Sequence, residues 1–176
     1  MTDAAPVPRT SPGADLREVA AALERSEVRR ELALEVAGLG TLFWDVAAGE
    51  DRWDERACAI LGVPADATFG PSLLGSIVHA DDRERARRLL ERALDPRTAA
   101  HDGRFEVAAR VVRPTDGLER HVVLNGQVFF RDDASGASRP WRVVAAVQDR
   151  TERVREELML RANEALARER LLALEA

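Results

Sequence analysis

Three runs of alternating apolar and polar residues follow one another in the second half of the chain, and they limit the possible folds more than any other feature. They span Arg104 to Arg113, Glu119 to Arg131 and Trp141 to Gln148. Alternation with a period of two is typical of strands that bury one face. Between the first two runs, Pro114 fixes φ and Gly117 allows positive φ, which favours a tight turn. The sequence therefore predicts three successive antiparallel strands.

Shorter elements precede these strands. A short strand is expected over Thr41 to Val46, with Asp51 to Trp53 as its hairpin partner, followed by short helical pieces over residues 57–62 and 71–78. The order of elements predicts an α+β domain, in which a five-stranded antiparallel sheet carries short helices on one face.

A longer helix is expected in the centre of the chain. Asp81 and Glu84 have the spacing of a capping box, so the acids can bind free amide groups of the first turn. Apolar residues then recur at helical spacing: Ala86, Leu89, Leu90 and Ala93. Asp95-Pro96 is expected to end this helix.

Two further helices are expected to flank the central domain of residues 39–150. Residues 1–13 are rich in Pro, Ser, Thr and Ala and are expected to be disordered, residues 14–38 form the first flanking helix, and residues 151–176 form the second. The N-terminal helix either packs on its own domain or pairs with a second copy. An isolated helix of this length is marginal in water, so the apolar side of the C-terminal helix needs a partner, and it is expected to pair with its own copy in a parallel coiled coil. The candidate dimer contacts are Leu16, Val19, Leu23, Val154, Leu158, Ala165 and Leu172.

Charge and composition exclude several classes of protein. The net charge of −5 gives no sign of general affinity for nucleic acid. No apolar run reaches the roughly 20 residues that a membrane span needs, and the N-terminus lacks the pattern of a signal peptide. A single cysteine, Cys58, excludes an internal disulfide and fits a reducing cytoplasm. Because the chain ends in mid-helix at Ala176, we expect either a piece of a longer receptor or a small adaptor.

Four segments in this order resemble a PAS domain of the PAS_3-like type. The first runs from Gly40-Thr41-Leu42-Phe43-Trp44-Asp45 through Trp53 to Ile60-Leu61-Gly62-Val63. The others are Val78-His79-Ala80-Asp81-Asp82-Arg83, then Arg113-Pro114-x-Asp116-Gly117, then Val147-Gln148-Asp149-Arg150-Thr151-Glu152-Arg153. This chain departs from the usual pattern at Ala80, where proline is common, and at Arg150, where an aliphatic residue is usual.

The resemblance implies a sheet curved around a small cavity in a bacterial signalling module that senses, dimerises and relays. It implies a partner effector, such as a histidine kinase or a diguanylate cyclase. It also implies a signal junction at Gln148, Asp149 and Thr151, where side-chain hydrogen bonds tie the last strand to the outgoing helix. The candidate pocket residues are Leu42, Trp44, Trp53, Ile60, Leu89, Leu124, Asn125, Gln127 and Val147.

The polar face formed by His121, Asn125 and Gln127 has two interpretations. If this face lines the cavity, it offers donors and acceptors to a polar ligand. If it points outward, it meets solvent, the N-terminal helix or a second protomer. The more apolar opposite face favours the outward orientation, although a bulge can reverse the local register.

Cofactor chemistry stays open, with two types not expected. Flavin photoreceptors of this family need a cysteine at the position that Leu73 occupies in this chain. They also use a glutamine on the last strand, where this chain has Val147. Covalent flavin photochemistry is therefore not expected, whereas noncovalent flavin is not excluded. Haem needs an axial ligand such as histidine. His79 is better interpreted as a hydrogen-bonding residue before a helix, and His101 falls in a polar loop.

No metal site and no enzymatic activity are expected. His79 with Asp81 and Asp82 suggests a metal, but helix capping explains the acids more simply. The sequence shows no nucleophile–base pattern with supporting context and no glycine-rich phosphate loop. Two functions remain: a sensor whose cavity binds a small molecule, or a ligand-free adaptor that dimerises or docks a partner.

Overall fold

The computed structural model describes residues 12–65, 67, 71–98 and 102–174. The segment expected to be a disordered tail lies almost wholly outside the described residues. The chain divides into two compact units, residues 1–37 and 38–176. The first unit contains one helix, α1 (Pro12–Val36).

The second unit contains the sheet and the remaining described helices. The strands are β1 (Leu39–Asp45), β2 (Glu50–Trp53), β3 (Arg104–Val112), β4 (Glu119–Asp132) and β5 (Ser138–Asp149). The helices are α2 (Glu55–Leu61), α3 (Pro71–Ile77), α4 (Ala80–Leu94) and α5 (Thr151–Leu174). All pairings are antiparallel, in the order β2-β1-β5-β4-β3. The predicted α+β class and five-stranded antiparallel sheet are confirmed.

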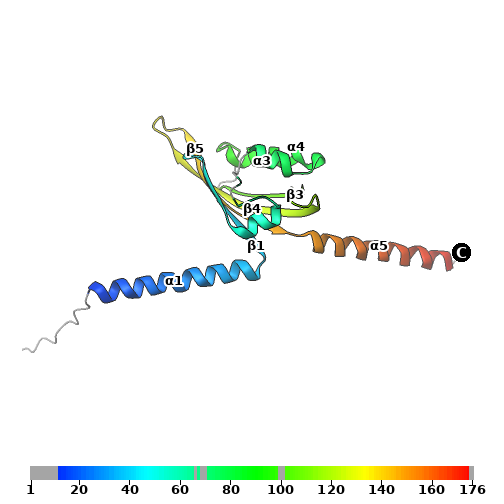
Figure 1. Ribbon diagram of the computed structural model, residues 1–176. Helices are drawn as coiled ribbons and strands as arrows, with labels where there is room; N and C mark the ends of the chain where they lie inside the picture. Colours follow the sequence, from blue (N-terminus) through cyan, green and yellow to red (C-terminus); the bar gives the residue numbers. More distant parts are fainter. Residues whose placement is uncertain (1–11, 66, 68–70, 99–101, 175–176) are drawn as a thin grey trace, which may run out of the picture. The chain divides into compact units, whose positions relative to one another are not determined.

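One face of the sheet forms the hydrophobic core. Along β3 the buried residues are Val107, Ala109 and Val111, and along β5 they are Val143, Ala145 and Val147. Their spacing of two is the alternation that predicted the strands. Helices α3 and α4 lie over the same face of the sheet (Figure 1). Cys58 of α2 is buried in this core, and the burial raises the pKa of its thiol.

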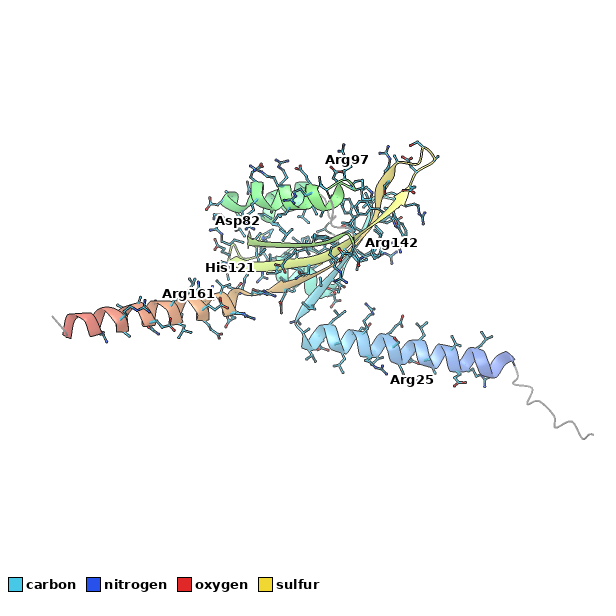
Figure 2. The ribbon with its side chains drawn as sticks, turned by 180° about the vertical axis from the view of Figure 1, so that it is seen from behind. Arg25, Asp82, Arg97, His121, Arg142 and Arg161 are labelled. Atoms are coloured by element: carbon cyan, nitrogen blue, oxygen red, sulfur yellow. The ribbon has the colours of Figure 1, made fainter. Side chains whose placement is uncertain are left out.

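A bulge interrupts the pairing of the long β4–β5 hairpin. Phe129 pairs with Arg142, but Phe130 pairs with Pro140, so Trp141 has no direct partner on β4. The guanidinium groups of Arg131 and Arg142 lie 4.4 and 4.1 Å from the centre of its ring. Arg142 marks this end of the sheet in Figure 2. The bulge therefore takes Trp141 out of the strict alternation along β5.

The start of α4 differs from the predicted capping box. The N-cap residue is His79, whose Nδ1 accepts the N–H of Asp81 at 3.3 Å. Asp81 instead lies in the first turn. Glu84 binds Arg87 and Arg88 on the exposed side of the helix, so it does not reach back to the cap. The prediction of Asp81 as the cap was wrong, whereas the hydrogen-bonding role of His79 before a helix is confirmed.

Candidate functional site

A cavity of about 510 Å³ lies between α4 and the core face of the sheet. Its volume falls in the range of small-molecule sites. The sheet contributes apolar side chains to the wall: Val107, Ala109, Val111, Val122, Leu124 and Val147. The rest of the wall is formed by Trp53, Leu61, Gly75, Ile77, Val78, Ala80, Arg83, Glu84, Ala86, Arg87, Leu90, Glu91 and Leu94. The wall is therefore apolar on the sheet side, and its charged residues all come from α4.

The beginning of α4 is held against β3, the edge strand of the sheet. Asp82 Oδ2 accepts the backbone N–H of Arg110 at 2.8 Å and its Nε–H at 3.0 Å. The N–H of His79 donates to the Arg110 carbonyl, and Val78 forms an isolated bridge with Val111. Asp82 lies at the N-terminal end of α4 in Figure 2. The hydrogen bonds from the Arg110 side chain hold the pKa of Asp82 well below its usual range.

The other end of α4 is held by apolar packing. Ala93 is buried in a cluster with Val128 of β4 and Val143 of β5. Between the two attachments, α4 presents the small side chain of Ala86 toward the cavity. The helix is thus fixed at both ends above a space that its own side chains do not fill.

The charges on α4 are largely paired with one another. Arg87 lies between Glu84 and Glu91 and bonds to both. The bonds from Arg87 and Arg88 lower the pKa of Glu84 to about 2. These side chains are exposed, so they form a polar margin to an apolar space.

Three of the nine candidate pocket residues lie in the cavity wall. They are Trp53, Leu124 and Val147. Leu42 packs against Ala145 in the core, Trp44 bridges two core clusters, and Ile60 packs on the α2 side of the core. Leu89 is half-buried on α4 but does not line the cavity. These four were placed by apolar character, which does not distinguish a filled core from a cavity.

Asn125 and Gln127 do not line the cavity either, because they lie on the outer face of β4. Asn125 is exposed, and the Nε2 of Gln127 donates to the carbonyl of Asp102 at 2.7 Å. Val122 and Val128 are buried on the core face of β4. Asn125 and Gln127 therefore point outward, which is the orientation that the apolar pattern favoured. The wall residues of α3 and α4 were missed. An i, i+3, i+4 stripe on α4 through Arg83, Ala86, Arg87 and Leu90 was the available signal.

The histidines stand apart from the cavity. His79 and His121 are not wall residues, and each has its Nε2 within 4.0 Å of Glu119, at 3.8 and 3.9 Å. His101 lies outside the described residues. Among the residues that the structure describes, no group of three or more His, Cys, Asp or Glu side chains is arranged to hold a metal ion. Asp82, one of the acids considered for a metal, binds Arg110 instead.

A compact hydrogen-bond network joins β5 to α5. Asp149 Oδ1 accepts the N–H of Thr151 at 2.8 Å and its hydroxyl at 2.5 Å. Thr151 Oγ1 in turn accepts the backbone N–H of His121 on β4 at 2.9 Å. The N–H of Arg150 donates to the carbonyl of His121 at 2.7 Å. Thr151 is only 2% exposed, so its hydroxyl is a buried polar group with its bonds satisfied.

The third predicted junction residue, Gln148, takes part through Arg150. Gln148 Oε1 accepts the Nε–H of Arg150 at 3.0 Å. The arginine that replaces an aliphatic residue is thereby held beside the strand by a polar contact. Arg120 Nη1 lies 3.9 Å from Asp149 Oδ2 and adds a positive charge to the same place. The structure brings all three predicted junction residues together.

The cavity and the junction share two strands. Val147 lines the cavity and pairs with Leu124, another wall residue. Two positions further on, Asp149 pairs with Val122 and binds Thr151. The wall residue Val147 and Asp149, which bonds to the first residue of α5, therefore lie on the same strand.

The candidate dimer contacts are exposed within a single chain. On α1, Leu16, Val19 and Leu23 are 60–71% exposed, and on α5 Leu158 is 56% exposed. Ala165 is also exposed and Val154 is half-buried. The side chain of Leu172 lies outside the described residues.

The second unit thus combines a five-stranded antiparallel sheet, a cavity under its helices and a hydrogen-bonded junction to α5. The family model for the PAS fold matches residues 50–147, which is more than half of the chain. The chain therefore belongs to the PAS family. Comparison with curated proteins found no match.

Solved structures of signalling proteins resemble this chain. One is a sensory box histidine kinase/response regulator from Burkholderia thailandensis, with 26% identity and a TM-score of 0.59, covering 80% of this chain and 98% of that one. Another is the N-terminal domain of a diguanylate cyclase with a PAS/PAC sensor from Marinobacter aquaeolei. It has 15% identity and a TM-score of 0.48, and the match covers 65% of this chain and 97% of that domain. No helix among the described residues is long and apolar enough to span a membrane.

Proposed function

We propose that this PAS domain is a signalling sensor that binds a small molecule in the cavity under α4 and relays its presence to α5. One observation carries the proposal. Val147 lines the cavity, and Asp149, two residues later on β5, binds the first residue of α5. Ligand that fills the space favours one position of β5, and the cap of α5 moves with that strand. In thermodynamic terms, the ligand shifts the population between two arrangements of the junction.

The output of this relay is a change in α5. Its exposed apolar residues need a partner, and a second copy of the same helix supplies one with matching geometry. We propose a homodimer joined through the flanking helices, α1 and α5. An effector of the histidine kinase or cyclase type is the proposed recipient, which is supported by the similarity to the sensory box protein from Burkholderia thailandensis.

The proposed role is binding and not catalysis, and the proposed location is the cytoplasm. The described wall consists mainly of Val, Leu, Ile and Ala side chains, and its acids on α4 are paired with arginine. Such a wall favours an apolar ligand held by exclusion of water.

The test combines ligand identification with a cavity-filling variant. The purified protein is examined by native mass spectrometry and by denaturing release of any bound molecule. Ala86→Leu places a larger apolar side chain in the wall, and we expect it to abolish binding while raising the melting temperature of the ligand-free protein. Leu89→Met on the same helix is the control, because Leu89 does not line the cavity and the exchange conserves volume.

Two outcomes separate the sensor from a ligand-free adaptor. In the sensor, bound ligand slows hydrogen exchange at the start of α5 in the natural chain and not in Ala86→Leu. A protein that carries no ligand, and whose melting temperature no compound in a broad library shifts, contradicts the sensor function. That result favours a module that only dimerises or docks a partner.

A further inference from the structure

We infer that the cavity takes an amphipathic anion, with an apolar tail against the sheet and an anionic head group at Arg83. This inference rests on the proposed function, since it requires that the cavity takes a ligand at all. It adds the chemical class of that ligand. Three observations carry it: the gradient of polarity across the cavity, the way Arg83 is held, and the pairing of the other charges on α4.

The gradient of polarity runs from the sheet to α4. The side formed by β3, β4 and β5 offers only apolar side chains, including Val107, Leu124 and Val147. A ligand part that lies there gains no hydrogen bond from a side chain and is selected for its apolar surface. The charged wall residues come from α4 alone. A ligand that fills the cavity and contacts both sides is therefore apolar at one end and polar at the other.

Arg83 differs from the other cation of the wall. Its Nε–H donates to the carbonyl of Val78 at 2.8 Å, which fixes the base of the guanidinium group beside the cavity. Among the described residues, no carboxylate forms an ion pair with its two terminal nitrogens. Arg87, one turn further along, is bonded to both Glu84 and Glu91. The wall thus holds one arginine whose charge is already matched and one whose terminal N–H groups are available.

The neighbouring acids do not pair with Arg83 because other arginines, on α4 and on β3, bind them. Asp82 bonds to Arg110, and Glu84 bonds to Arg87 and Arg88. A guanidinium group with a fixed base and two parallel terminal N–H donors matches the geometry of a carboxylate. The head group that complements the wall is therefore a carboxylate or another small oxyanion, and a cationic head would meet Arg83 unfavourably.

Head-group preference is tested by calorimetric titration with three ligands that share one tail. Decanoate, decanol and decyltrimethylammonium are titrated below their micelle-forming concentrations into the whole chain. We expect decanoate to bind at least about tenfold more tightly than decanol, as a charge-assisted pair with arginine implies, and the cation to bind most weakly. Equal binding of all three, or preference for the cation, overturns the inference and leaves the proposed function standing. If none of the three compounds binds and no other ligand is found, both the inference and the proposed function are contradicted.

Variants assign the preference to one side chain. Arg83→Gln is expected to weaken decanoate about tenfold and to change decanol by less than about twofold, because only the charged pair is lost. Arg88→Gln is the matched control, because Arg88 lies on the same helix and bonds to Glu84 but is not a wall residue, and it is expected to leave the preference intact. If Arg83→Gln binds neither ligand, the preference for decanoate over decanol is measured in Arg83→Lys, which keeps the positive charge. Retained preference for decanoate supports the inference, whereas decanol binding without that preference overturns it.

Discussion

Asp149 and Thr151 form a closed pair at the exit of the domain, in which one carboxylate oxygen accepts both the backbone N–H and the hydroxyl of the threonine. The hydroxyl then accepts a backbone N–H from His121 on β4. The start of α5 is consequently bound to two strands at once. Its order depends on the sheet and not only on helix propensity.

Replacing Asp149 is expected to release α5 while the domain stays folded. Asp149→Ala removes both bonds to Thr151, and a single intramolecular hydrogen bond typically contributes about 0.5–1.5 kcal/mol. The amides in the first two turns of α5 should exchange with deuterium faster, while those in the centre of β4 and β5 keep their protection. Asp45→Ala is the control, because Asp45 also accepts two backbone N–H groups, but in the β1–β2 turn. Unchanged exchange in α5 of Asp149→Ala would show that the relay does not pass through this pair.

The Asp82–Arg110 pair is expected to make the domain sensitive to acid. Because the pKa of Asp82 is lower in the fold than its ordinary value of 3.8, the carboxylate stabilises the fold fully above that value. This contribution declines as the pH falls below 3.8 toward the lower folded pKa. Asp82→Asn should therefore cost about 1–3 kcal/mol of unfolding free energy at neutral pH. The difference from the natural chain should shrink below about pH 4.

Urea unfolding at several pH values measures this difference. Glu84→Gln serves as the control, because Glu84 is exposed and bonds only within its own helix. Because water screens its exposed ion pairs, Glu84→Gln should cost clearly less unfolding free energy than Asp82→Asn. The difference in unfolding free energy between Asp82→Asn and the natural chain could instead stay constant down to the lowest measurable pH. That result would show that the loss comes from the shape of the side chain and not from its charge.

Two glycines with the same backbone conformation are expected to respond differently to alanine. Gly49 and Gly103 have φ of 69° and 68°, where a side chain costs roughly 1–2 kcal/mol. A Cβ at Gly49 meets no atom within 4 Å, whereas one at Gly103 would lie 2.1 Å from the carbonyl oxygen of Val128. Gly103→Ala should therefore lose clearly more unfolding free energy than Gly49→Ala in urea titrations. Equal losses would mean that the chain before β3 moves away from β4 without cost.

Removing α5 is expected to abolish or weaken dimerisation. The exposed apolar side chains of α5, such as Leu158, are lost when the chain ends at Arg153. Light scattering of the natural chain and of this shortened chain at equal concentrations measures the mass. Circular dichroism verifies that the shortened chain keeps its sheet. If both chains are monomeric at high concentration, the coiled-coil proposal fails.

The sheet could be predicted from sequence because burial of one face imposes a local pattern. Val107, Ala109 and Val111 alternate with exposed residues, and no distant contact is needed to see it. The junction could also be predicted from sequence, because Asp149 and Thr151 are close in sequence and both residue types form hydrogen bonds with nearby backbone. Trp141 shows the limit of this reasoning, because a bulge depends on how β4 and β5 are matched.

The cavity could not be placed from local patterns. Its existence depends on the distance between α4 and the sheet, which is set by contacts such as Asp82 with Arg110, 28 residues apart. Apolar character alone predicts pocket positions for Leu42, Ile60 and Val147 equally well, although only Val147 lines the cavity. Only the three-dimensional packing separates the residues of a filled core from those that border a space.

The position of Trp53 gives the protein an internal fluorescent probe. Of the three tryptophans, Trp53 alone lines the cavity, with its indole N–H bonded to Asp51 at 2.9 Å. Trp44 packs in the core, and Trp141 lies under two arginines. Displacement of water from the cavity changes the polarity around the Trp53 ring alone. A chain that keeps only this tryptophan would therefore report occupancy through its emission wavelength, without any attached dye.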